Sequence, residues 1–220
     1  MKTRAEIIVV GYQSYEFAQS LIVGEIEFLE YRLDLSLFDA LIFTSKNALR
    51  SLVWNANKYE EMQSWQEIPS FVIGEGSAQA VRDFGGIVCY VSKKSHGASF
   101  AREIIPLLDQ KKVLYLRAWN IVSHLDLILQ QAGINLVSQI TYKSKCKTHL
   151  VCQAPKKDSV LLFTSPSAYR YFKESFGWDE SYLAVALGKT TYASFEDQIQ
   201  RLLSPFQDIK RSIEFLRKSI

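Results

Sequence analysis

Hydroxyl-bearing residues stand at four places where a short apolar run gives way to a helix-like segment. Serine and threonine at such a turn accept hydrogen bonds from the first free N–H groups of the helix. Those N–H groups and the positive end of the helix dipole also attract an anion. Capping alone explains any single turn, but four such turns together predict a site for a ligand with several negative groups. In chain order the turns are Thr44-Ser45, Gly76-Ser77, Thr164-Ser165 with Ser167, and Thr190-Thr191.

Basic side chains on or near the same turns strengthen the prediction of an anionic ligand. They are Lys46, Arg50, Arg117, Arg170 and Lys189. The whole chain carries a net charge of only +3, with 26 Lys and Arg against 23 Asp and Glu. Proteins that bind nucleic acid usually concentrate more positive charge on one face, so we expect a small acidic ligand and no nucleic acid.

Metal and nucleophile chemistry have weaker support. Cys146, His149 and Cys152 in "CKTHLVC" have a spacing that resembles that of zinc ligands. On a strand, however, residues three apart face opposite sides, and a fourth ligand is not in view. His96 and His124 stand without a paired nucleophile, and no G-x-S-x-G motif occurs. The sequence therefore favours a structural or surface role for these cysteines and predicts no metal site.

The turns connect short apolar runs to longer amphipathic segments, and the two kinds of segment alternate along the chain. Apolar runs that are unbroken are typical of parallel strands buried on both faces. Their alternation with helices predicts an α/β fold with mainly parallel sheets. The expected strands are 7–10, 40–43, 71–73, 87–91, 113–116, 136–142, 160–163 and 183–187. The expected helices are 45–55, 77–84, 98–110, 121–132, 167–176, 191–203 and an amphipathic C-terminal helix with Ile209, Ile213, Leu216 and Ile220 on its apolar side.

The composition is that of a globular protein, with 48% hydrophobic and 22% charged residues. A chain of 220 residues suffices for one large domain or two small ones. Three cysteines are too few for a disulfide framework, which indicates a reducing compartment. The first residues contain no signal-peptide pattern, and no apolar run approaches the ~20 residues that span a bilayer. We expect a cytoplasmic protein with no membrane segment.

A repeat indicates two domains of related design. "ALIFTSKNALRSL" (40–52) matches "VLLFTSPSAYRYF" (160–172) at an offset of 120 residues. "FVIGEGSAQAV" (71–81) matches "VALGKTTYASF" (185–195) at an offset of 114 residues. Strand-turn-helix units resemble one another in all α/β folds, but the shared order of Thr-Ser and then Gly-x-x-Ser/Thr is more specific than shared composition.

The motifs as an ordered series resemble those of the uroporphyrinogen-III synthase family. The series is "DALIFTSKNALRSL", "SFVIGEGSAQAVRDFG", "KVLYLRA", "QITYKS", "VLLFTSPSAYRYF" and "AVALGKTTYASF". The likeness runs from about Gly24 to about Phe195. It implies two flavodoxin-like α/β domains with mainly parallel sheets, which face a common cleft and are joined by a two-stranded connection. A discontinuous first domain would comprise residues 1–32 and 143–220, and residues 33–142 would form an inserted second domain.

The resemblance also implies a lyase of tetrapyrrole (heme) biosynthesis that acts as a monomer without a metal or organic cofactor. Its substrate would be hydroxymethylbilane, a linear tetrapyrrole with many carboxylates. The substrate would lose water, pass through an azafulvenium cation and a spiro intermediate, and close with its last pyrrole ring inverted to uroporphyrinogen III. Because a pyrrole nitrogen expels the hydroxyl, the enzyme would mainly fold the substrate and exclude the spontaneous, non-inverted closure.

The resemblance assigns roles to particular residues. Tyr142 in "ITYKS" matches the family's tyrosine at the connection, which would assist the departing hydroxyl by hydrogen bonding or proton donation. Taken alone, Tyr142 is explained equally well as a strand tyrosine that fills an interface. The expected substrate-binding residues are Thr44, Ser45, Lys46, Ser77, Arg117, Ser165, Ser167, Thr190 and Thr191.

Several positions depart from the family pattern. "IIVVGYQSYEFAQS" lacks the Thr-Arg-Pro that often ends the first strand and is short for a full strand-helix unit. Lys46 stands where proline is frequent, and Ala118 stands where glycine is common. Lys46 could contact a substrate carboxylate or be solvated. The alternative is a non-catalytic two-domain module that binds or senses an anionic small molecule, although Tyr142 and the pair Ser77 and Thr191 favour the enzyme.

Overall fold

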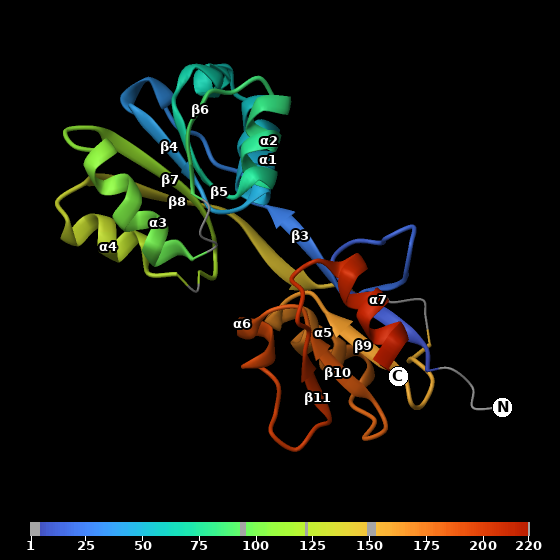
Figure 1. The fold of residues 1–220 in the computed structure, drawn as a ribbon. Coiled ribbons are helices and arrows are strands. Elements are labelled where there is room, and N and C mark those ends of the chain that lie inside the picture. Colours follow the sequence, from blue (N-terminus) through green and yellow to red (C-terminus); the bar gives the residue numbers. More distant parts are fainter. Residues whose placement is uncertain (1–4, 93–95, 122, 149–152, 220) are drawn as a thin grey trace. The chain divides into compact units, whose positions relative to one another are not determined.

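The computed structural model describes residues 5–92, 96–121, 123–148 and 153–219 (Figure 1). The chain divides into two compact units. Unit 1 comprises Met1–Glu25 and Ser144–Ile220, and unit 2 comprises Ile26–Lys143. Each unit has its own mainly parallel sheet, which confirms the mixed α/β class expected from the sequence. Among the described residues, the longest apolar helices fall short of what a membrane crossing requires.

Unit 1 is built on a five-stranded parallel sheet with the strand order β11-β10-β9-β1-β2. The sheet alternates its side chains between two hydrophobic clusters, so that Phe163 packs with helix α5 and Leu162 packs with helix α7. The strands are β1 (Ile7–Gly11), β2 (Gln19–Ile22), β9 (Val160–Phe163), β10 (Leu183–Ala186) and β11 (Arg201–Leu203). The helices are α5 (Pro166–Phe176), α6 (Lys189–Tyr192) and α7 (Ile209–Ser219).

Unit 2 is built on a six-stranded sheet with the order β3-β8-β7-β4-β5-β6, and its strands from β8 to β6 are parallel. Helices α1 and α2 cover one face and α3 and α4 cover the other (Figure 1). The strands are β3 (Gly24–Phe28), β4 (Ala40–Phe43), β5 (Ser70–Ile73), β6 (Val88–Ser92), β7 (Lys112–Ala118) and β8 (Asn135–Cys146). The helices are α1 (Lys46–Ala56), α2 (Glu75–Asp83), α3 (Gly97–Ile104) and α4 (Leu125–Gln131), with 3-10 turns at Leu35–Leu37, Glu60–Glu67 and Ile105–Leu107.

Strands β3 and β8 carry the chain from one unit to the other and lie side by side in one sheet. Lys143 pairs with Glu27 at 2.9 Å, and Lys145 pairs with Glu25 at 3.1 Å. As the residue number rises on one strand it falls on the other, so the two strands are antiparallel. The polar alternation of both strands, with acids on β3 and lysines on β8, matches a ribbon whose faces are not fully buried.

Residues from Ile26 onward belong to unit 2. The first domain expected from the sequence extended to residue 32. The Asn55 side chain on α1 accepts from Tyr31 N at 3.1 Å and donates to Leu29 O at 3.1 Å. Tyr31 and Leu33 also pack against the hydrophobic cluster under α1 and α2. These contacts explain why the division between the units falls before Ile26.

The helix expected over residues 191–203 is wrong. Helix α6 ends at Tyr192, and Leu202 pairs in parallel with Val185 as part of the edge strand β11. Arg201 stabilises the turn in between, because its guanidinium donates to Phe195 O at 3.2 Å. The apolar residues of this segment therefore complete the sheet rather than one side of a helix.

The opening unit of the sheet is short, as its sequence indicated. Strands β1 and β2 are parallel, yet the residues between them form no helix, only a turn in which Tyr15 bridges to Ala18. Parallel strands are usually joined by a longer crossover. The amphipathic C-terminal helix is confirmed as α7, whose Ile213 and Leu216 are buried against the sheet; Ile220 lies outside the described residues.

Candidate functional site

The carboxyl edge of the unit 2 sheet collects the site residues predicted between positions 44 and 142. Thr44 follows β4, Ser77 lies on the helix after β5, and Arg117 lies near the end of β7. Tyr142 lies on β8 opposite Ala118. Because β8, β7, β4 and β5 are consecutive parallel strands, these residues lie along one edge of the sheet, where ligands of open α/β sheets bind.

The turn after β4 begins helix α1 with a serine cap. Ser45 Oγ accepts from Asn47 N at 3.2 Å, as the sequence predicted for a capping hydroxyl. Thr44 Oγ1 lies 3.2 Å from the hydroxyl of Tyr115, whose pKa is raised chiefly by its burial. Lys46 is exposed at the first position of the helix. The Ser45 hydroxyl proton and the Lys46 ammonium at the positive end of the α1 dipole are thus placed to meet an anion.

Helix α2 begins without a side-chain cap. Its N-cap residue Gly74 has a φ of 74°, a backbone conformation that glycine adopts at little cost. In the part of the chain that the structure describes, a Cβ added at Gly76 would meet nothing within 4 Å. Ser77 is half-buried in the first turn and its N–H donates to Gly74 O at 3.2 Å. The uncapped first turn leaves N–H groups for a ligand or for water.

Arg117 turns back toward its own strand end. Its guanidinium donates to Ala118 O at 3.0 Å and to Trp119 O at 3.4 Å, and its buried Nε has no hydrogen-bond partner among the described residues. Arg117 is therefore held at the sheet edge as a half-buried cation, while Trp119 is 58% exposed beside it. A fixed cation of this kind suits a carboxylate.

Tyr142 is positioned through its neighbours on β8. It packs against the hydrophobic cluster beneath α1 and α2, and its carbonyl accepts from Trp119 N at 2.8 Å. The preceding residue, Thr141, accepts two hydrogen bonds at its carbonyl, from Ser51 Oγ at 2.6 Å and from Leu29 N at 2.9 Å. Since Ser51 is fully buried on α1, the helix and the residue that follows β3 together fix the β8 backbone that carries the Tyr142 phenol.

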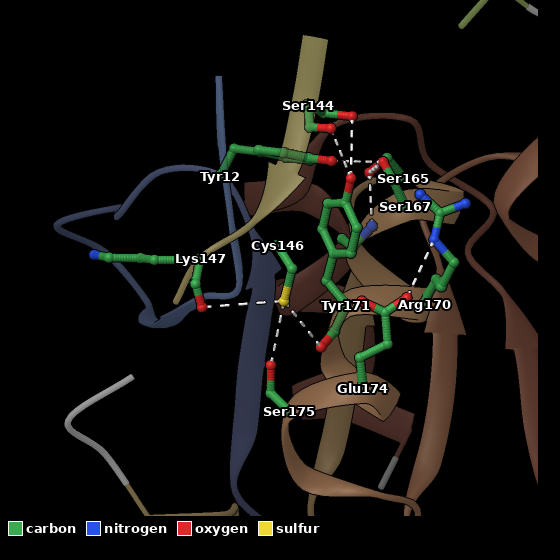
Figure 2. A network of polar contacts seen from close by, with 11 residues as sticks. Tyr12, Ser144, Cys146, Lys147, Ser165, Ser167, Arg170, Tyr171, Glu174 and Ser175 are labelled. Carbon is green, nitrogen blue, oxygen red and sulfur yellow. Dashed lines mark hydrogen bonds and ion pairs between the residues drawn. The ribbon is translucent and has the colours of Figure 1, made fainter. Parts of the chain in front are cut away.

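The carboxyl edge of the unit 1 sheet carries the second set of hydroxyls (Figure 2). Ser165 caps helix α5 by accepting from Ala168 N at 3.2 Å, and its Oγ lies 3.2 Å from Ser167 Oγ. Tyr12 follows β1, the neighbour of β9 in the sheet, and its phenol donates to Ser167 Oγ at 2.6 Å. Tyr12 was not predicted from the sequence, because a tyrosine after Gly11 does not match the small-hydroxyl turn pattern.

The turn after β10 presents one of its two predicted threonines to solvent. Thr190 is exposed in α6, whereas Thr191 is only 4% exposed. The backbone carbonyl of Thr191 accepts from Ser194 Oγ at 2.6 Å. Thr190 is therefore the member of the pair that a ligand can reach, and Thr191 packs inward.

A pocket of about 500 Å³ lies beside these turns in unit 1. It is lined by Pro166, Tyr169, Arg170, Lys173, Glu174, Ser194 and Glu196. Its cations are neutralised within the unit, since Lys173 pairs with Glu196 and Arg170 lies 3.6 Å from Glu174. The hydroxyl turns, rather than this pocket, remain the anion-binding candidates.

The described residues contain no cluster of three His, Cys, Asp or Glu side chains able to hold a metal ion. Cys146 Sγ instead lies 3.5 Å from Ser175 Oγ and 4.0 Å from Tyr171 O, which is the contact pattern of a packed thiol (Figure 2). His149 and Cys152, the other members of the zinc-like spacing, lie outside the described residues.

Each unit thus offers hydroxyls and helix N-termini at the carboxyl edge of a parallel sheet, and unit 2 adds the cations Lys46 and Arg117. Hydrogen-bond donors of this kind suit carboxylates. Tyr142 is the predicted site residue with an acidic proton that could assist a leaving group. Each of the two edges, taken by itself, carries groups that can hold a carboxylate.

Comparisons with known proteins identify relatives of the whole chain. A family model described as "HEM4: Uroporphyrinogen-III synthase HemD" matches residues 7–206. The crystal structure of uroporphyrinogen-III synthetase from Helicobacter pylori 26695 is 32% identical, with a TM-score of 0.86 over 98% of this chain and 100% of that one. A mutant uroporphyrinogen III synthase from the extremely thermophilic bacterium Thermus thermophilus shares the fold, with 13% identity and a TM-score of 0.62 over 98% of this chain and 97% of that one. No curated protein matched this sequence.

Proposed function

Because this chain belongs to the uroporphyrinogen-III synthase family of lyases, we propose that it converts hydroxymethylbilane to uroporphyrinogen III with inversion of the last pyrrole ring. The family's substrate is a tetrapyrrole. Because a pyrrole nitrogen of that substrate would expel the hydroxyl, the reaction needs no paired catalytic acid and base from the protein. The observation that carries the proposal is the repeated hydroxyl-lined edge, which supplies carboxylate-binding groups in both units.

Tyr142 is the residue to which we assign a direct role in the dehydration. Its phenol would hydrogen-bond to the departing hydroxyl or give it a proton, while a pyrrole nitrogen pushes electrons toward the same carbon. The C–O bond breaks, water leaves, and the substrate becomes an azafulvenium cation. The substituted carbon of the last ring then attacks that cation to form a spiro intermediate, which rearranges and loses a proton to give the inverted macrocycle.

The hydroxyl turns would hold the substrate in the fold that leads to inversion. In unit 2 these are Thr44, Ser45 and Ser77, with Lys46 and Arg117 as cations. In unit 1 they are Ser165, Ser167 and Thr190. Binding at several carboxylates restricts the substrate before the chemical step, so that the non-inverted closure is suppressed.

The hydroxyl of Thr191, predicted to bind substrate, is not among the groups that we assign to the substrate. Since Thr191 is 4% exposed, its backbone rather than its hydroxyl is what the turn after β10 can offer.

We further propose that the protein acts in the cytoplasm as a monomer, in keeping with three cysteines and no disulfide framework.

The test is a coupled assay in which hydroxymethylbilane is generated in situ and the products are oxidised and separated as isomers. Type III porphyrin formed in excess of type I supports the proposal. Type I alone, at the rate of the uncatalysed closure, would contradict it and would favour the module that binds an anionic ligand without turnover.

A further inference from the structure

Tyr12 occupies the carboxyl edge of the unit 1 sheet beside the hydroxyl turn of α5 (Figure 2). It follows directly after β1, which pairs in parallel with β9, so Tyr12 and the Ser165–Ser167 turn extend from neighbouring strands. The Tyr12 phenol donates to Ser167 Oγ at 2.6 Å, a short hydrogen bond between residues 155 positions apart.

The Tyr12 ring is held on two sides. On one side lies Gly24, where an added Cβ would come within 2.5 Å of a Tyr12 ring carbon. On the other side lies the ring of Tyr171, edge-on with a centroid distance of 6.4 Å and an interplanar angle of 73°. The Tyr171 hydroxyl has a different partner from that of Tyr12 and donates to Ser144 O at 2.8 Å. The direction of the Tyr12 hydroxyl is therefore set before any ligand binds.

The hydroxyl protons of this turn can be counted. Tyr12 gives its proton to Ser167 Oγ, and Ser165 Oγ accepts from Ala168 N. Ser165 and Ser167 then hold two protons between them, and their mutual contact at 3.2 Å uses only one. At least one serine proton is left to point at a ligand, and a hydroxyl that accepts a hydrogen bond becomes a better donor.

We propose that Tyr12 is a positioning residue for the carboxylate-binding turn of unit 1, acting through Ser167. It directs a serine proton toward a substrate carboxylate. This inference rests on the proposed function, since it takes the substrate to be a polycarboxylate tetrapyrrole that is bound at this turn.

The test compares Tyr12→Phe with Tyr171→Phe. Both variants keep the aromatic ring and remove one phenolic hydroxyl from the same cluster, but only the first removes the bond to Ser167. We expect Tyr12→Phe to raise KM for hydroxymethylbilane about 3- to 10-fold, the loss of one hydrogen bond, with kcat within about twofold. We expect Tyr171→Phe to leave KM within about twofold. An unchanged KM in Tyr12→Phe, or an equal rise in both variants, would overturn the inference.

A double-mutant cycle tests the route through Ser167. Ser167→Ala removes the acceptor, so Tyr12→Phe should add little when it is made on the Ser167→Ala background. Additive effects of the two changes would show that Tyr12 acts in another way.

Equilibrium binding of uroporphyrin III, the oxidised product, separates this inference from the proposed function. Weaker binding by Tyr12→Phe and unchanged binding by Tyr171→Phe would support the role of Tyr12 even if the wild-type protein formed only type I porphyrin. If the wild-type protein forms type III porphyrin and Tyr12→Phe changes neither the KM nor the affinity for uroporphyrin III, the proposed function stands and the inference about Tyr12 is rejected.

Discussion

The buried hydroxyl of Ser51 donates to the carbonyl of Thr141 at 2.6 Å, one residue before Tyr142. A serine inside a helix commonly points to solvent or bonds to the carbonyl four residues earlier in its own helix. Here it reaches a neighbouring strand instead, so α1 and β8 are tied together at the point that orients the proposed catalytic phenol.

Ser51→Ala should lower both stability and turnover. The Thr141 carbonyl keeps its bond from Leu29 N, so the unfolding free energy should fall by about 1–2 kcal/mol rather than more. The kcat should fall several-fold because β8 is held less firmly beside α1. Ser219→Ala removes an exposed serine that also donates to a backbone carbonyl, and it should change neither quantity. Chemical denaturation and the isomer assay measure the two effects, and a loss of stability without a loss of kcat would make Ser51 a packing residue only.

Tyr142→Phe should lower kcat by about 10²-fold, the smaller end of what a positioned proton donor contributes. The ring remains packed on the cluster under α1 and α2, so the melting temperature should stay close to that of the wild type. Steady-state kinetics with product isomer analysis is the measurement. A variant that folds normally and turns over at the wild-type rate would remove Tyr142 from the mechanism.

Ser165→Asp separates helix capping from anion binding. Aspartate caps a helix as well as serine does, and its charge interacts favourably with the helix N-terminus, so stability should be kept or slightly raised. The added negative charge should nevertheless repel a substrate carboxylate and raise KM by more than 10-fold. Ser165→Ala should instead lose about 1 kcal/mol of stability, and its KM should rise less than that of Ser165→Asp. Equal KM values in the two variants would leave the serine a structural cap.

Thr190→Val and Thr191→Val form a matched pair at adjacent positions. Thr190 is exposed and Thr191 is 4% exposed, so only the first should affect substrate binding. We expect Thr190→Val to raise KM about 3- to 10-fold and Thr191→Val to leave it within about twofold. Kinetics at several substrate concentrations would resolve the two, and a larger effect at position 191 would reverse the assignment.

Buried tyrosines make the protein sensitive to alkaline pH. Burial raises the pKa of Tyr115 above its ordinary value of 10.0, so the folded state keeps a proton that the unfolded state loses above about pH 10. The folded state then binds more protons, and the unfolding free energy falls as pH rises, by about 1.4 kcal/mol per pH unit for each such group.

Tyr115→Phe should flatten that decline. At neutral pH it should cost about 1 kcal/mol, because the contact with Thr44 is lost. Denaturation curves collected between pH 7 and about pH 11 measure both effects. Tyr15→Phe, at a half-buried tyrosine in the connection after β1, controls for the loss of a phenol. A decline as steep in Tyr115→Phe as in the wild type would contradict the prediction.

The sequence predicted the buried parallel strands well because their apolar runs report directly on burial. Ala40–Phe43 and Val160–Phe163 have the same bounds in the structure as in the sequence analysis, and every residue of both is buried. The edge strands β2 and β3 were not predicted, since QSLI and GEIEF mix polar with apolar residues. Each of them pairs with a single neighbouring strand, so it needs no continuous apolar run.

Tertiary contacts decided the positions at which the pattern was ambiguous. Leu202 and Leu203 fit one side of a helix in sequence, yet the free edge of β10 pairs with them as β11. The hydroxyl turns could be located because capping is local, whereas Tyr12 depends on the pairing of β1 with a strand about 150 residues later. No local pattern reports such a contact.

The pairing of β1 with β9 also sets the order in which the protein can assemble during translation. Unit 2 is continuous, and the last strand of its sheet, β8, is complete once Cys146 has been synthesised. The apolar strand Ile7–Gly11 must wait for Val160–Phe163, and it leaves the ribosome about 150 residues earlier. At about 5–20 residues per second that interval is roughly 8–30 s, far longer than most domains need to fold. The inserted unit therefore has time to fold first and to bring the ends of β3 and β8 together, which shortens the loop that must close before the discontinuous unit can form.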